Sequence, residues 1–73
     1  MTVEVFKTNV GTRRYANKLL NQIHTAFTWY NANFDLDDCD KILRIQCNQG
    51  VIKPKVLILF LKDLGCHAEL LPD

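Results

Sequence analysis

The order in which two kinds of apolar periodicity follow one another constrains this chain more than any other feature. Apolar residues recur at steps of three and four over residues 12–27 and again over 54–64, which places them on one face of a helix. Patterns typical of strands occupy residues 3–6, 29–36, 41–47 and 66–71. The predicted order is β-α-β-β-α-β, whose usual solution is a four-stranded antiparallel sheet with two helices on one face, an α+β sandwich.

The length and charge of the chain restrict its function class. Residues 1–73 carry enough apolar surface for one modest core, so we expect a single domain. Nine basic and eight acidic residues give a net charge of +1, which excludes strong electrostatic attraction to nucleic acid. The longest apolar run, residues 56–61, is far shorter than the ~20 residues that cross a bilayer. We expect neither a nucleic-acid partner nor a membrane span.

The three cysteines, Cys39, Cys47 and Cys66, bear on the compartment in which the protein works. Three is an odd number and too few for a disulfide framework. The first residues also lack the charged and apolar segments of a signal peptide. We therefore expect a cytoplasmic protein with reduced thiols.

Several short motifs lie at the spacing of one known family. Residues 9–16 read Asn-Val-Gly-Thr-Arg-Arg-Tyr-Ala, in register with a Gly-Met-x-Cys-x-x-Cys-Ala segment, while residues 34–36 and 43–45 match Val-Asp-Leu and Val-x-Val strands. The tail positions that follow the same pattern are Pro54, Leu57, Phe60, Leu61, Leu64, Gly65, Ala68 and Leu71. Over nearly its whole length the chain thus resembles the heavy-metal-associated (HMA) domain of copper chaperones and metal-pumping ATPases. The resemblance implies a ferredoxin-like fold.

The resemblance fails at the metal-binding motif itself. Thr12 and Tyr15 occupy the positions of the family's two cysteines, and neither a hydroxyl nor a neutral phenol is a good ligand for a soft ion such as Cu(I). The family's metal-carrying activity is therefore not expected, and no cofactor is predicted. Residues 34–44 also resemble a segment of small bacterial proteins without the cysteine pair, and this second resemblance implies no function.

Other candidate ligands are expected at the same end of the sheet, where the first loop, the hairpin turn and the loop before the last strand meet. A degenerate metal-binding or thiol-redox carrier would use Cys66, with Cys39 of a second chain as a further ligand; alternatively, Cys66 is a half-buried packing residue. The acidic run at residues 35–40 lacks the glycine and distal glutamate of an EF-hand loop, which favours a solvated turn. His24 lies on the polar side of the first helix and is expected to be solvated.

Two stretches are candidates for contact with a partner. Arg13 and Arg14 oppose the dipole at the start of the first helix, which indicates either an anionic partner or simply a soluble surface. In the second helix Val56, Ile58 and Leu59 are apolar in addition to the residues needed for its inner face. They form either an interaction surface or the margin of a wide core stripe.

The residues that catalytic sites require are missing from this sequence. It contains no serine, no glycine-rich phosphate loop and no Cys–His pair at the spacing of a nucleophilic site. We therefore predict a non-enzymatic interaction module that self-associates or docks on another protein through the second helix or an exposed edge strand. The metal or thiol-redox carrier is the alternative.

Overall fold

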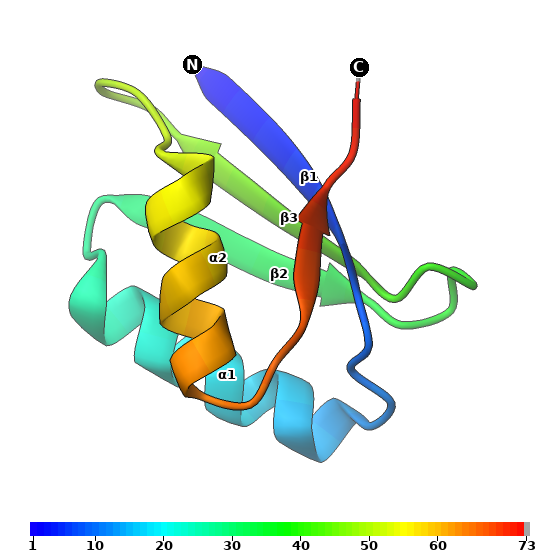
Figure 1. Ribbon diagram of the computed structural model, residues 1–73. Coiled ribbons are helices and arrows are strands. Elements are labelled where there is room, and N and C mark those ends of the chain that lie inside the picture. Colours follow the sequence, from blue (N-terminus) through cyan, green and yellow to red (C-terminus); the bar gives the residue numbers. More distant parts are fainter. Residues whose placement is uncertain (73) are drawn as a thin grey trace.

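The computed structural model describes residues 1–72, which form strands and helices in the predicted order (Figure 1). The elements are β1 (Thr2–Thr8), α1 (Arg13–Ala26), β2 (Tyr30–Asp35), β3 (Ile42–Cys47), α2 (Pro54–Asp63) and β4 (Ala68–Leu70). The strands form one sheet in the order β2-β3-β1-β4, and each neighbouring pair is antiparallel. Both helices cover the same face of the sheet, so the predicted ferredoxin-like α+β sandwich is confirmed.

The core lies between the sheet and the helices, and both layers contribute to it. Its largest fully buried side chains include Phe6, Leu19, Ile23, Leu43, Ile45, Leu57 and Leu61. They come from the two central strands and from the inner faces of both helices, as the helical and strand periodicities predict. Removing this apolar surface from water, at about 25 cal/mol per Å², is the main force that holds the layers together.

The residues at the helix ends explain where each helix begins and stops. Thr12 precedes α1 in an extended conformation, and its Oγ1 accepts a hydrogen bond from the Tyr15 amide at 3.2 Å, as expected of an N-cap. Pro54 lies in the first turn of α2, where no intrahelical partner is needed for its nitrogen. Gly65 follows α2 with a φ of +82°, a conformation that costs glycine little.

The strands β2, β3 and β4 are shorter than predicted, whereas β1 covers Thr2–Thr8 and extends beyond the predicted residues 3–6. Trp29 lies before β2 rather than in it, with its ring edge-on to Phe27 at 6.1 Å between centroids. Lys41 has a φ of +48° and belongs to the hairpin turn, so β3 begins one residue later. The last strand covers Ala68–Leu70 instead of 66–71. In each case tertiary context, rather than the local pattern, decides where pairing stops.

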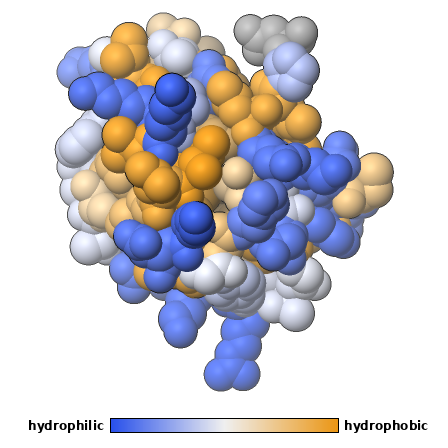
Figure 2. Space-filling model, in the orientation of Figure 1, coloured by the Kyte–Doolittle hydropathy of each residue, from blue (hydrophilic) through white to orange (hydrophobic). Residues whose placement is uncertain are grey.

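Apolar side chains also reach the solvent side of α2. Figure 2 shows them over the region of α2, bordered by hydrophilic side chains. Val56 is 48% exposed and Leu59 60% exposed, whereas Ile58 is half-buried and packs against the core. No helix within residues 1–72 has the length and apolar character needed to cross a bilayer.

Candidate interaction surface

The residues predicted to share one end of the sheet do lie together there. We call this the loop end: residues 9–15 after β1, 36–41 between β2 and β3, and 64–67 before β4. The amide of Thr8 donates to the carbonyl oxygen of Asp40 at 3.0 Å, and the amide of His67 donates to Oδ1 of Asn9 at 3.1 Å. The three loops are therefore tied to one another through β1.

Thr12 and Tyr15, at the positions of the family's cysteines, both have structural contacts. Thr12 caps α1, while the Tyr15 hydroxyl donates to the carbonyl oxygen of Leu64 at 3.1 Å and so joins α1 to the end of α2. Burial and the nearby Cys66 thiol raise the pKa of Tyr15, so the hydroxyl keeps its proton at neutral pH. At the position of the family's second cysteine, Tyr15 thus makes a hydrogen bond that joins the start of α1 to the end of α2.

Cys66 is more deeply buried than the half-buried thiol that the sequence predicts. It is 1% exposed and belongs to the core cluster. Burial raises the pKa of the Cys66 thiol, which keeps it protonated and a poor metal ligand or nucleophile near neutral pH. Cys39 is exposed on the β2–β3 hairpin, at the other side of the sheet. The structure does not bring these two cysteines of one chain together, and Cys47 is buried in the core cluster.

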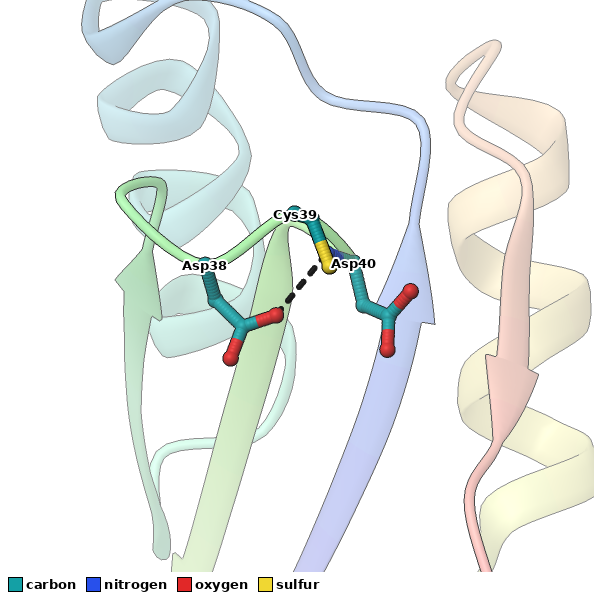
Figure 3. A group of neighbouring side chains, drawn as sticks. All are labelled: Asp38, Cys39 and Asp40. Carbon is teal, nitrogen blue, oxygen red and sulfur yellow. Dashed lines mark hydrogen bonds between the residues drawn. The ribbon is translucent and has the colours of Figure 1, made fainter.

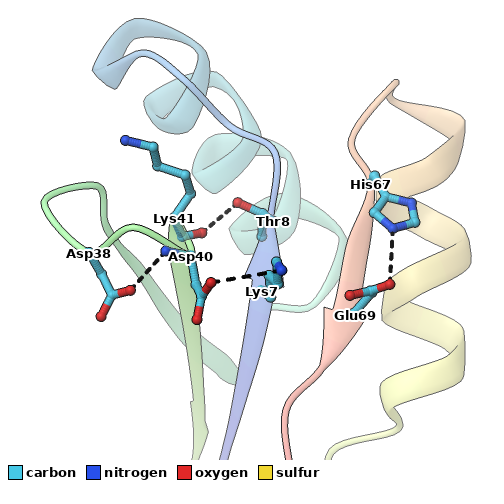
Figure 4. A network of polar contacts seen from close by, with 7 residues as sticks. All are labelled: Lys7, Thr8, Asp38, Asp40, Lys41, His67 and Glu69. Atoms are coloured by element: carbon cyan, nitrogen blue, oxygen red, sulfur yellow. Dashed lines mark hydrogen bonds and ion pairs between the residues drawn. The ribbon is translucent and has the colours of Figure 1, made fainter.

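Asp38, Cys39 and Asp40 gather at the hairpin turn, where their potential ligand atoms lie within 4.8 Å of one another (Figure 3). The Asp38 carboxylate accepts a hydrogen bond from the Asp40 amide at 2.8 Å, and the Asp40 carboxylate lies 3.8 Å from Nζ of Lys7 (Figure 4). Calcium takes six to eight oxygen ligands, whereas this cluster offers two carboxylates and a sulfur, which is a soft ligand. The contacts within the turn account for this cluster.

Two residues of α1 have roles that the sequence did not predict. His24 is not simply solvated, because its Nε2 accepts a hydrogen bond from the Ala32 amide at 3.0 Å. Nη2 of Arg13 donates to the carbonyl oxygen of Phe34 at 3.3 Å, so this guanidinium serves the fold, whereas Arg14 is simply exposed. Both contacts reach β2 from the helix beside it. Helical periodicity carries no signal for them, since they depend on how α1 lies against the strand edge.

These contacts cover part of the outer edge of β2. In an antiparallel ladder alternate residues turn their main-chain groups toward opposite neighbours, and Tyr30, Ala32 and Phe34 turn theirs away from β3. The Tyr30 amide donates to the carbonyl oxygen of Phe27, also at 3.0 Å. Together with the contacts of His24 and Arg13, this bond satisfies three outward-facing groups of the strand.

The outer edge of β4 has no such cover. The amide of Leu71 donates to the carbonyl oxygen of Val5 at 2.9 Å, and the same alternation then makes Lys7 and Glu69 the next bonded pair. Ala68 and Leu70 therefore turn their N–H and C=O groups away from β1. Within residues 1–72 no side chain or other segment bonds these outward groups.

A groove of about 450 Å³ lies beside this open edge. Ile58, Leu59 and Lys62 line it from α2, while Cys66 and Ala68 line it from the segment that leads into β4. No carboxylate lines the groove, and Glu69 is paired with His67 at 3.5 Å (Figure 4). Sequence patterns indicated the apolar surplus of α2 but not the groove, which exists only because α2 and β4 are neighbours.

We compared the chain with protein-family models, with curated proteins and with solved structures, and none of the three comparisons gave a significant match. A ferredoxin-like fold by itself does not determine function, since one fold serves many activities. The resemblance to the HMA domain therefore stays a prediction from the sequence, and the function has to be argued from the surface described above.

Proposed function

We propose that this chain is a non-enzymatic, HMA-like interaction domain of the cytoplasm that binds a protein partner through its α2–β4 flank. This flank consists of the exposed apolar residues of α2, the adjoining groove and the open edge of β4. One observation carries the proposal: the solvent-exposed Leu59 and the unbonded main chain of Ala68 border the same groove. Side-chain and main-chain binding groups thus face a single partner site.

The apolar residues of the flank do not all serve the core. Ile58 is half-buried and belongs to the margin of the core stripe, but Val56 and Leu59 remain largely exposed. Fully burying one such aliphatic side chain against a partner would contribute about 1.5–3 kcal/mol. An exposed apolar patch rimmed by polar side chains is a common mark of a protein contact.

A display selection tests this proposal. Random twelve-residue peptides are selected on the wild-type protein and then compared on two variants: Leu59→Glu on the flank and Lys18→Glu on the exposed side of α1. We expect enriched peptides to bind the Lys18→Glu variant as they bind wild type, and to lose at least about tenfold in affinity for Leu59→Glu. Peptides that bind both variants equally would show that the flank is not the binding surface.

The rival function, a metal or thiol-redox carrier that uses Cys66 with Cys39, has less support. Cys66 is enclosed in the core and its thiol pKa is raised, so it offers no exposed thiolate for an ion shared with Cys39 of a second chain. We expect reduced protein to bind no Cu(I) in competition with a strong chelator. Tight binding that Cys66→Ser abolishes would favour the carrier.

A further inference from the structure

We infer that the partner is an extended segment that adds to β4 as a fifth strand and carries an apolar residue between two acidic ones. This inference rests on the proposed function, because it assigns the occupant of the same flank. Its first support is the main chain of Ala68 and Leu70, whose outward N–H and C=O groups match the ladder of an added strand. A helical partner would leave these groups unpaired.

The groove determines what one side chain of the added strand should be. Successive side chains of a strand point to opposite faces, so every second residue of the partner would face α2. Such a side chain would enter the space between Ile58 and Leu59 on one side and Ala68 on the other. A branched aliphatic residue such as isoleucine has the size and polarity that this lining favours.

The charges on α2 determine the neighbours of that apolar residue. Lys55 and Lys62 lie on the same helical face as Ile58 and Leu59, at spacings of three, four and seven residues. The two lysines are about 10 Å apart along the helix axis, while strand residues four apart span about 13 Å. Acidic residues two positions before and two positions after the apolar one would therefore reach them, giving the pattern acidic-x-apolar-x-acidic.

A second copy of this chain fits the flank less well. Antiparallel pairing of two β4 strands around Glu69 would place the two Glu69 carboxylates directly opposite each other, which is destabilising. The same arrangement would bring the basic α2 faces of both copies toward one site. Charge complementarity thus favours an acidic segment over self-association.

A titration followed by amide chemical shifts tests the inference. The probe is the peptide Thr-Thr-Glu-Thr-Ile-Thr-Glu-Thr-Thr. One control replaces both glutamates by lysine. A second, the proline peptide, replaces the two threonines beside isoleucine by proline and carries an N-methyl group on the isoleucine amide, which removes the central donors whether the added strand is parallel or antiparallel to β4. We expect the acidic peptide to bind with a Kd on the order of 0.1 mM and to shift the Ala68 and Leu70 amides. The lysine peptide should bind about tenfold more weakly, and the proline peptide should not bind.

A pair of matched protein variants checks the charge argument. Lys55→Glu combined with Lys62→Glu should reverse the preference, so that the lysine peptide binds more tightly than the acidic one. Arg14→Glu combined with Lys18→Glu makes the same change in net charge on α1 and should keep the preference of wild type. All four side chains are exposed, so neither variant disturbs the core.

Several outcomes would overturn strand addition without overturning the proposed function. The first is that the proline peptide binds as tightly as the acidic peptide, and the second is that the acidic and lysine peptides bind equally. The third is that the amide chemical shifts of Val56 and Leu59 change while that of Ala68 does not. A dimer in concentration-dependent light scattering, with the flank amides broadened, would make a second copy the occupant. If no peptide shifts any flank residue and the display selection yields no flank-dependent binder, the proposed function itself fails.

Discussion

The two β-α-β halves of this domain differ in how the outward main-chain groups of their outer strands are hydrogen-bonded. In the β1-α1-β2 half, side chains of α1 and the loop after it bond three outward groups of a six-residue strand. In the β3-α2-β4 half, a three-residue strand keeps its outward groups free beside a helix with an apolar solvent face. Open edges favour unwanted strand pairing, and proteins usually cover or shorten them. Within residues 1–72 the chain bonds three outward groups of β2 and none of those of β4, and this difference supports the proposal that β4 receives a partner.

The largest expected effect is a difference in the free energy of unfolding between substitutions on the buried face and on the exposed face of α2. Leu61 is fully buried, so Leu61→Ala should lower the free energy of unfolding by about 2–5 kcal/mol through lost burial and a residual cavity. Leu59→Ala on the exposed face should change it by less than about 0.5 kcal/mol. Urea unfolding of both variants measures the difference. A similar loss for the two would mean that Leu59 serves the core instead of a partner.

A smaller effect is expected where α1 closes β2. His24→Ala removes the acceptor of the Ala32 amide and should cost about 1 kcal/mol of stability. His67→Ala is the matched control, because His67 is exposed and its Nε2 pairs only with Glu69 at the surface. We expect the control to change stability by less than about 0.5 kcal/mol. Equal losses in thermal or urea unfolding would show that His24 does not close this edge.

The Tyr15 contact at the loop end should give a smaller loss still. Tyr15→Phe keeps the ring and removes only the hydroxyl that donates to Leu64. Because water can replace part of this exposed contact, we expect a loss of about 0.5–1 kcal/mol in urea unfolding. A neutral or stabilising result would mean that the bond does not hold α1 and α2 together.

The smallest effect concerns pH and the buried thiol of Cys66. Its pKa is raised in the folded protein, so in alkaline solution the unfolded chain loses this proton first and stability falls as pH rises. The contribution is complete below about pH 8.5, the usual thiol value, and disappears as pH passes the folded pKa. Unfolding measured from pH 7 to 10 should show a steeper decline for wild type than for Cys66→Ala. Parallel curves would contradict the burial effect.

Local patterns predicted most of the fold because its elements follow simple rules. The spacing of Leu19, Ile23, Leu57 and Leu61 identified the buried helix faces. The helix predicted over residues 54–64 ends one residue earlier, at Asp63, and Gly65 follows it with a positive φ. The candidate site was predicted only in part. The apolar surplus of α2 can be read from its sequence, but its division into a half-buried Ile58 and an exposed Leu59 depends on how the helix is rotated against the sheet.

The contrast between the two edges could not be predicted at all. The contact between His24 and Ala32 joins residues eight apart in the chain, and its geometry depends on the packing of α1 against β2. The direction of the free groups on β4 likewise depends on the register with β1, which places Ala68 opposite Thr8. A shift of one residue in the β1–β4 register or in the β2–β3 register would exchange the bonded and the free main-chain groups of the edge strand.

Amide hydrogen exchange at two alanines tests the central claim most directly. Ala32 and Ala68 both lie on edge strands and turn their amides outward, but only Ala32 has a partner for its N–H. In the free protein we expect Ala32 to exchange slowly and Ala68 and Leu70 to exchange rapidly, and the acidic peptide should slow only the latter two. Equal protection of Ala32 and Ala68 without peptide, or no slowing with it, would contradict the account.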